Sequence, residues 1–246
     1  MREFKDLTYR GKLRRYRWVA QAALDAYGLG EAHLRFIRDN GNTVYRVKAK
    51  DPTPVDESLY VKDCYALRLH WTGYHEEAAV ESELEWLAAL SDEGLPVPQP
   101  LRTLEGKLTA KVAVPGVPGV RQCSIIRWVK GRQATKGVRP WHLTAIGRLI
   151  AQLHDHASRW NPPKGFTRRH YDTNGLWGDD TGTGYTAKEV WPDIPKQYFT
   201  DFEEITRRVQ QVMDAWGKGP DVFGLIHADL GTKANVFFHK GGAHAI

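Results

Sequence analysis

The sequence predicts an α+β fold in which a strand-rich N-terminal half precedes a mostly helical C-terminal half. Short runs rich in β-branched and aromatic residues, separated by Gly, Pro and Asn, lie between residues 34 and 129, and this pattern is typical of antiparallel strands. From residue 140 onward, apolar residues recur at helical spacing. That periodicity is typical of amphipathic helices.

The composition is that of an ordinary globular protein. No apolar run in the 246 residues approaches the length of a membrane span, and the N-terminus lacks the apolar core of a signal peptide. The two cysteines, Cys64 and Cys123, lie inside expected strands without metal-type spacing. These features predict a cytoplasmic protein with reduced thiols and no membrane partner.

The net charge of +6 favours anionic partners. Part of the excess lies in the basic run from Lys12 to Arg17, which is one feature of nucleic-acid binders. No recognised nucleic-acid module accompanies the run, so the solvated face of a basic helix is the favoured interpretation. The oligomeric state is not readable from the sequence.

The first expected element is a helix over residues 8 to 27, where apolar residues share one side. Gly28 and Gly30 follow its end, as is common after helices. We interpret residues 1–30 as an N-terminal accessory helix that packs on the structure that follows.

A hairpin is expected next, with strands at residues 34–37 and 43–47 and an Asn-Gly turn between them. A plain structural hairpin and a turn that folds over the phosphates of a nucleotide are both consistent with this pattern. In the second case, small residues would let the backbone come close to the phosphates. The turn consists of Asp39, Asn40, Gly41 and Asn42.

A basic residue and an acidic residue occur on the next two expected elements, a strand through residues 65–69 and a helix from about His75 to Leu90. A cation on a strand can pair with a Glu on the following helix and hold phosphates. Arg68 and Glu83 are the candidates, although surface positions for both remain the alternative.

A hairpin of residues 101–104 and 107–114 and a strand over residues 123–129 complete the strand-rich half. The boundary between the halves is expected near residues 127 to 131, so residues 31–130 would form the first lobe and residues 131–246 the second. A strand that crosses between lobes can offer backbone groups to an adenine. The candidates there are Arg127, Trp128 and Val129.

Two long helices are expected in the second half, over residues 140–157 and 196–216. An apolar run, Val222 to Ile226, then predicts a buried strand before a His-x-Asp motif. Asp229 in that motif is placed to accept a hydroxyl proton, and Asn235 offers an oxygen to a magnesium ion. An ordinary polar turn is the alternative for this segment.

The order of these features resembles the aminoglycoside phosphotransferase/choline kinase-like family, which includes homoserine-kinase-like bacterial members and shares the protein-kinase fold. The resemblance extends from about residue 34 to residue 246. The segments that carry it are Tyr65 to Arg68, Glu83 to Leu87, Leu149 to His154 and Leu225 to Asp229. It implies a bilobal protein-kinase-like fold with an antiparallel-sheet N-lobe and an incomplete helical C-lobe.

The resemblance also implies ATP-dependent phosphoryl transfer to a small-molecule hydroxyl, with ATP and Mg²⁺ as cofactors. Asp229 would be the catalytic base, His227 would brace its loop and Asn235 would bind the metal. Arg68 and Glu83 would take the positions of the family's phosphate-holding Lys and its helix partner. The turn at residues 39–42 would cover the phosphates, and residues 127–129 would meet the adenine.

Three departures from the family pattern bear on activity. Arg68 replaces a Lys, the spacing from Asp229 to Asn235 is one residue longer, and residues 236–246 contain no acidic side chain, where the family has a metal-binding Asp. The missing C-lobe helices would also leave apolar faces open to water. A catalytically inactive, truncated nucleotide-binding or interaction protein is therefore the alternative to an active kinase.

Overall fold

The structure, a computed structural model, describes residues 2–51, 54–72, 76–178, 186–233 and 235–246. Its helices are α1 (Tyr9–Ala26), α2 (Glu77–Asp92), α3 (Pro140–Arg159), α4 (Thr173–Trp177), α5 (Ala187–Val190) and α6 (Phe199–Trp216), with short 3₁₀ turns at Phe4–Asp6, Trp191–Asp193 and Lys196–Tyr198. Its strands are β1 (His33–Asn40), β2 (Asn42–Lys48), β3 (Tyr60–Leu69), β4 (Ala110–Val112), β5 (Arg121–Val129), β6 (Val236–His239) and β7 (Gly242–Ala245). The expected mixture of an antiparallel sheet and helices is confirmed.

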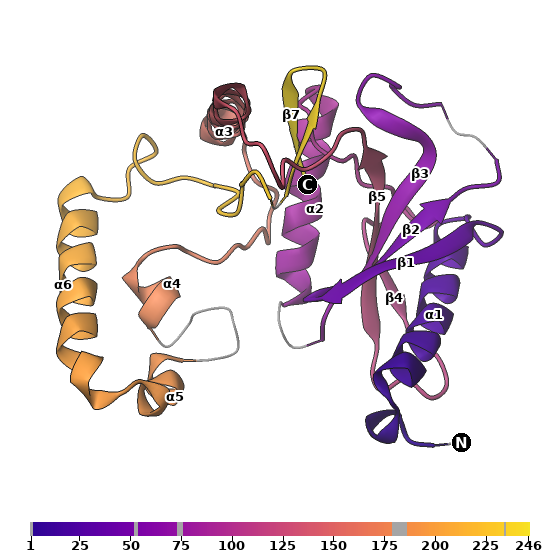
Figure 1. The fold of residues 1–246 in the computed structure, drawn as a ribbon, viewed down its shortest axis with the longest axis horizontal. Coiled ribbons are helices and arrows are strands. Elements are labelled where there is room, and N and C mark those ends of the chain that lie inside the picture. Colours follow the sequence, from indigo (N-terminus) through magenta and orange to yellow (C-terminus); the bar gives the residue numbers. More distant parts are fainter. Residues whose placement is uncertain (1, 52–53, 73–75, 179–185, 234) are drawn as a thin grey trace. The chain divides into compact units, whose positions relative to one another are not determined.

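Five strands form one antiparallel sheet in the order β1-β2-β3-β5-β4 (Figure 1). One face of this sheet carries the core of the first half, because Tyr45, Leu67 and Ile125 lie side by side on it and are buried. The apolar side of α1 packs against these residues. The sheet therefore has one face covered by α1, and the side chains of Arg68 and Ser124 lie on the other face.

Helix α1 matches the expected helix, and the hydroxyl of Thr8 caps it by accepting a hydrogen bond from the Gly11 amide at 3.2 Å. The basic run is not entirely a solvated face, which corrects the sequence-based interpretation. Arg15 is buried and donates to the carbonyl oxygens of Gly116 and Arg2. Burial of a charged guanidinium costs free energy unless its N–H groups are hydrogen-bonded, and the two carbonyl oxygens provide these hydrogen bonds for Arg15.

The second strand pairing of the first half differs from the expectation. The turn at Glu105 and Gly106 is present, with the Thr103 amide donating to the Lys107 carbonyl at 2.8 Å. The segments that flank it do not form a hairpin with each other, because β4 pairs with β5. By pairing with β5, strand β4 becomes part of a five-stranded sheet and buries its apolar side chains in the core. An isolated two-stranded hairpin would bury less apolar surface.

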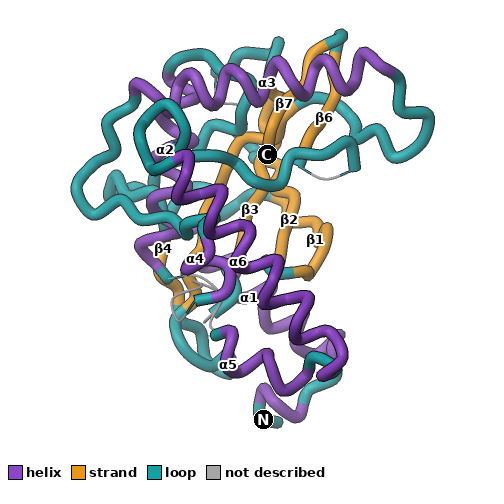
Figure 2. Tube along the Cα trace, turned by 90° about the vertical axis from the view of Figure 1, so that its left-hand side faces the viewer, coloured by secondary structure: helices purple, strands orange, loops and turns teal. Residues whose placement is uncertain are grey.

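The apolar run from Val222 to Ile226 is not a strand, which corrects a second expectation. Val222 and Ile226 are 53% and 42% exposed. No strand in the described part of the chain pairs with this segment, and an apolar sequence alone cannot satisfy the backbone groups of a strand. The strands β6 and β7 after Asn235 do form a hairpin (Figure 2).

Packing divides the chain into two compact units. The first unit comprises residues 1–72, 84–152 and 227–246, and the second comprises residues 73–83 and 153–226. The three-part division predicted from the sequence, at residues 30 and 130, stays a prediction beside this result. Among the described residues, no helix combines the length and apolar character that a membrane span requires.

Helix α6 in the second unit keeps an apolar side open to water, as expected. It contains no buried residue. Its exposed large apolar residues are Phe202, Ile205, Val212 and Trp216. Trp191 packs edge-on against Phe199 and Phe202 near its start, with ring centroids 5.2 and 5.9 Å apart.

Candidate active site

The loop between His227 and Asn235 is attached to the first unit through the segment that follows β5. Arg132 and Phe238 exchange backbone hydrogen bonds of 3.2 and 3.0 Å, and the Ala134 amide donates to the Thr232 carbonyl at 3.0 Å. Trp141 at the start of α3 packs edge-on against Phe238 at 5.6 Å. These contacts place β6, and therefore Asn235 before it, beside the end of the large sheet.

Asp229 and Asn235 meet within this loop. The Asn235 side-chain amide donates to the Asp229 carboxylate at 2.6 Å and to the Asp229 carbonyl at 3.1 Å. The extra residue in the spacing therefore does not separate the two side chains. Ala234 lies outside the described residues, so the place where the extra residue is absorbed is not described.

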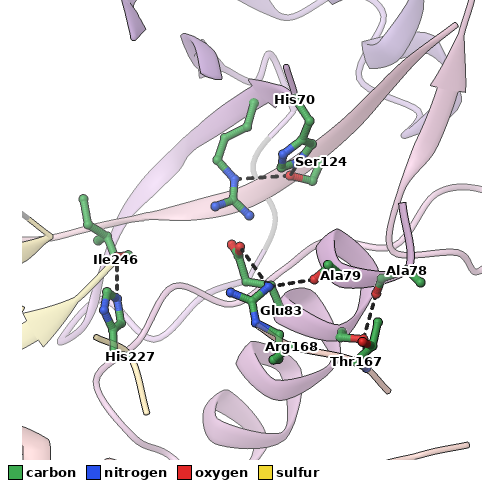
Figure 3. Close-up of polar contacts among 11 residues, drawn as sticks. His70, Ala78, Ala79, Glu83, Ser124, Thr167, Arg168, His227 and Ile246 are labelled. Carbon is green, nitrogen blue, oxygen red and sulfur yellow. Dashed lines mark hydrogen bonds and ion pairs between the residues drawn. The ribbon is translucent and has the colours of Figure 1, made fainter. Parts of the chain in front are cut away.

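His227 connects the start of the loop to β7. Its Nδ1 accepts a hydrogen bond from the Asp229 amide at 3.3 Å, and its Nε2 lies 3.1 Å from the Ile246 carbonyl oxygen (Figure 3). A neutral imidazole with its proton on Nε2 satisfies both contacts at once. The Ile246 amide in turn donates to the Asn235 carbonyl at 2.9 Å, so both ends of the loop are tied to the same residue.

Two residues of the loop adopt a left-handed backbone. Ala228 has φ 65° and Asn235 has φ 54°. This conformation is unfavourable for Ala, whereas Asn tolerates it. Strain of this kind concentrates at functional sites, where the surrounding contacts must maintain it.

The predicted turn at residues 39–42 is the tip of the β1–β2 hairpin, and the strands extend further into it than expected, since Asn40 pairs with Asn42 and only Gly41 lies between the strands. Gly41 has φ 72°, a conformation that glycine adopts at no steric cost. Asp39 accepts a hydrogen bond from the Thr43 hydroxyl at 2.6 Å. Burial and, after it, the Asp39 carboxylate raise the pKa of the nearby Tyr9.

Arg68 lies on the sheet face opposite to α1. It pairs in register with Ser124 on β5, and its Nε donates to the Ser124 hydroxyl at 3.3 Å. The His70 Nε2 lies 2.9 Å from the same hydroxyl (Figure 3). The guanidinium is therefore fixed on this face, as a residue that holds phosphates would need to be.

Glu83 interacts with a basic residue that the sequence analysis did not single out. Arg168 lies 3.9 Å from the Glu83 carboxylate and donates to the Ala79 carbonyl at 2.8 Å (Figure 3). The adjacent Thr167 amide donates to the Ser82 hydroxyl at 2.9 Å, so this loop is clamped to the start of α2. The pairing of Glu83 with Arg68 remains a prediction, since the two residues belong to different packing units.

The strand at residues 127–129 has part of its backbone already engaged. The Arg127 amide donates to the Gln99 carbonyl and the Lys130 amide to the Leu59 carbonyl, both at 2.8 Å. The Arg127 side chain donates to Gln99 Oε1 at 2.8 Å, and the Arg46 guanidinium lies over the Trp128 ring at 5.1 Å. Any adenine contact here would fall on the backbone between residues 127 and 130.

The structure thus brings together His227, Asp229 and Asn235, and it fixes Arg68 on the sheet. Sequence reasoning missed Ser124 and Arg168 as partners of the predicted residues. Ser124 can be identified from the strand register once the pairing of β3 and β5 is known. Nothing in the sequence around Arg168 marks it as the partner of Glu83, since it is one of two adjacent arginines. The predicted roles of all these residues remain predictions.

Comparison with known proteins gives the context for this loop. The phosphotransferase enzyme family matches residues 33–246. Amicoumacin kinase of Bacillus subtilis (strain 168) is 25% identical over 219 residues, which are 86% of this chain and 56% of that protein. An uncharacterized protein of Synechocystis sp. is 31% identical over 100 residues, which are 41% of this chain and 27% of that protein.

Solved structures show the same fold. A microcompartment-associated aminopropanol kinase superposes with a TM-score of 0.66 at 27% identity, covering 90% of this chain and 64% of that chain. Amicoumacin kinase hAmiN, solved in complex with AMP-PNP, Ca²⁺ and Ami, superposes with a TM-score of 0.70 at 19% identity, covering 97% of this chain and 66% of that chain. The chain therefore spans about two thirds of these structures and 27–56% of the curated relatives.

The family model covers all of the large sheet, the loop with Asp229 and Asn235, and the β6–β7 hairpin. It also covers the four segments that carried the resemblance in the sequence. On this basis the chain belongs to the phosphotransferase enzyme family, which has the fold of the small-molecule kinases.

Proposed function

We propose that this chain forms the nucleotide-binding and catalytic-loop part of an ATP-dependent kinase that acts on a hydroxyl group of a small molecule. The observation that carries the proposal is the 2.6 Å hydrogen bond from the Asn235 amide to the Asp229 carboxylate. It holds a proton acceptor and an amide oxygen together in one exposed loop. Membership of the phosphotransferase family supports the same reaction class.

Asp229 is the group that would orient the acceptor hydroxyl and take its proton. The side chain is exposed, and its Oδ2 accepts the hydrogen bond from Asn235. Among the described residues none donates to Oδ1, so this oxygen is open to a substrate hydroxyl. A positioned carboxylate of this kind acts as a general base at a hydroxyl.

The Asn235 side chain fits a hard divalent cation such as Mg²⁺ as one of its ligands. Because the Asn235 Nδ2 is directed at Asp229, the amide oxygen Oδ1 is left for another partner, and amide and carboxylate oxygens are the ligands that such cations prefer. No group of three His, Cys, Asp or Glu side chains within the described residues forms a metal site, so phosphate oxygens would complete the coordination. The bound ion would supply charge compensation for the phosphates.

The remaining residues would position the reactants. His227 keeps the Asp229 loop tied to Ile246 through its two hydrogen bonds. Arg68, fixed by Ser124, would hold a phosphate, and the turn at residues 39–42 would lie over the phosphates. The presence of AMP-PNP and Ca²⁺ in the hAmiN structure supports a nucleotide and a divalent cation.

A cytoplasmic location is part of the proposal. Cys64 and Cys123 are both buried and free, and free thiols are usual in reducing compartments. The acceptor is proposed only as a small molecule that carries a hydroxyl group. Aminopropanol and amicoumacin are the names attached to two relatives, and they guide the choice of test compounds.

The test is transfer of labelled phosphate from ATP to a panel of amino alcohols and hydroxylated antibiotics, with nucleotide affinity measured in parallel. Asp229→Asn should lower the transfer rate by about 10²- to 10⁴-fold because the general base is lost, while ATP affinity stays within about threefold. Asp221→Asn is the matched control, since Asp221 is an exposed carboxylate a few residues earlier. Transfer by Asp229→Asn at the wild-type rate would contradict the proposed role.

A nucleotide-binding protein without transfer activity is the second candidate. The observation that favours it is Arg68, a forked guanidinium at the position where the family pattern has a Lys, since the two cations hold phosphates with different geometry. The same assay distinguishes the two candidates. ATP binding without transfer to any acceptor supports the second, and transfer that depends on Asp229 supports the first.

A further inference from the structure

A cavity of about 310 Å³ lies beside the hairpin tip, and all the residues that line it belong to the first packing unit. Its wall is built by α1, by the β1–β2 turn and by the adjoining ends of β3 and β5. The lining residues on which the inference depends are Tyr16, Asp39, Thr43, Leu69, Trp71 and Arg121. None of the catalytic-loop residues lines this cavity.

The strand register places the cavity on the α1 side of the sheet. Asp39 pairs with Thr43, and Thr43 pairs with Leu69, so these three side chains share one face. Leu69 packs in the core with α1. Arg68 is the next residue on β3 and points to the other face, so the cavity and the proposed phosphate-holding side chain lie on opposite sides of one hairpin.

Arg121 is an unusual residue to find in such a wall. Its side chain is on β5, and the residue is only 9% exposed. One NH₂ group donates to the Tyr16 hydroxyl at 3.3 Å, and the guanidinium lies 5.2 Å from the Tyr16 ring centroid. Its Nε is buried and has no hydrogen-bond partner in the part of the chain that the structure describes.

A buried guanidinium without an anionic partner is unfavourable, and buried charges are normally paired. No described carboxylate forms an ion pair with Arg121. Asp39 lines the same cavity, yet it accepts its hydrogen bond from Thr43 and no ion pair joins it to Arg121 within the described residues. A cation and an anion therefore face one cavity without neutralising each other.

We propose that this cavity is a binding site for a small zwitterion, whose carboxylate or phosphonate-type group binds Arg121 and whose ammonium group binds Asp39. The volume of about 310 Å³ is at the lower end of the range for ligand sites, which suits a molecule of amino-acid size. The anionic group supplies the charge partner that the Arg121 guanidinium lacks among the described residues. The cavity shares Asp39 with the hairpin turn at residues 39–42, but its binding groups lie on the α1 side of the sheet, opposite to Arg68, so binding there does not require phosphoryl transfer.

The test observes Arg121 directly by recording the Nε–Hε signals of the arginines in the ¹⁵N-labelled protein. The Arg121 signal is assigned as the one that disappears in Arg121→Lys. It is then followed during titration with β-alanine, with 2-aminoethylphosphonate and with acetate. We expect the signal to shift and saturate with at least one zwitterion, at a concentration at least tenfold below that needed for acetate, which lacks the ammonium group.

The comparison of the two zwitterions identifies the anionic group, because the tighter one shows whether a carboxylate or a phosphonate is preferred. Arg102 is the matched control, since it lies in an exposed turn and donates to the Gly106 carbonyl; its signal should not move, and Arg102→Lys should bind normally. An Arg121 signal that no ligand shifts would overturn the proposal. Equal saturation by acetate and both zwitterions would also overturn it. If Arg121→Lys is unstable, the Nε–Hε signal of Arg121 is assigned by through-bond correlations in the wild-type protein, and the same titration decides these outcomes.

Discussion

At the scale of single residues, the loop from His227 to Asn235 depends on contacts that hold an unfavourable backbone. Ala228 and Asn235 are both left-handed, and the Asn235 amide bridges to Asp229. An Asn at this position serves two purposes, because it tolerates the backbone conformation and donates the hydrogen bond. The two purposes can be separated by substitution.

The free energies of unfolding of Asn235→Gly and Asn235→Ala, measured by urea denaturation, distinguish the contribution of the hydrogen bond from that of the backbone conformation. Glycine keeps the backbone conformation without strain but removes the amide, so we expect the free energy of unfolding to fall by about 1 kcal/mol. Alanine removes the amide and adds left-handed strain, so it should be about 1 kcal/mol less stable than the glycine variant. Equal stability of the two variants would mean that the backbone at residue 235 carries no strain.

At the scale of elements, the site depends on the contact between β6 and the segment that follows β5. Gly131 follows β5 with φ 127°, and a Cβ atom there would lie 2.8 Å from the Phe238 carbonyl oxygen. That oxygen accepts the hydrogen bond from the Arg132 amide. The absence of a side chain at residue 131 is what lets β6, and so the end of the loop from His227 to Asn235, approach the sheet.

Gly131→Ala should therefore be much more disruptive than Gly41→Ala. Both glycines have positive φ, but a Cβ on Gly41 would meet nothing within 4 Å. We expect Gly41→Ala to cost about 1 kcal/mol through backbone strain alone, and Gly131→Ala to cost about 1–3 kcal/mol more. Urea denaturation of the two variants measures the difference; equal costs would show that Phe238 moves aside freely.

At the scale of the whole molecule, the core of the first unit contains ionisable groups that must remain neutral. Burial raises the pKa of the Cys123 thiol to about 12 and that of the Tyr45 hydroxyl to about 12. Burial also raises the pKa of Tyr27, whose hydroxyl donates to the Leu108 carbonyl at 2.8 Å. The unfolded chain loses these protons at lower pH than the folded protein does.

The protein should consequently lose stability in alkaline solution. The folded state binds more protons than the unfolded state above the ordinary pKa values of 9.0 for Cys and 10.0 for Tyr, so stability is full below about pH 9 and falls as pH rises toward 12. Urea midpoints between about pH 8 and pH 11 measure this loss. Tyr45→Phe should reduce the slope above pH 10, whereas Tyr198→Phe, at an exposed position, should leave it unchanged.

The sequence by itself determined the elements whose signals are local. The periodicity of residues 8–27 and 140–157, the Asn-Gly turn at residues 40–41 and the order of Arg68, Glu83 and Asp229 are properties of short segments, and they predicted the helices, the hairpin and the family. The sequence also placed Asp229 and Asn235 in one loop, but it left open whether their side chains meet, because six residues of extended chain span up to about 20 Å.

Only the tertiary structure decided the features that depend on partners distant in the sequence. The run at residues 222–226 has the composition of a strand but no strand beside it, and β4 pairs with β5 because the sheet buries more apolar surface than a local hairpin would. Arg168 next to Glu83, and Arg121 across a cavity from Asp39, meet through folding alone. Local preference is fixed by each segment, whereas pairing and burial depend on which other surfaces the fold brings within reach.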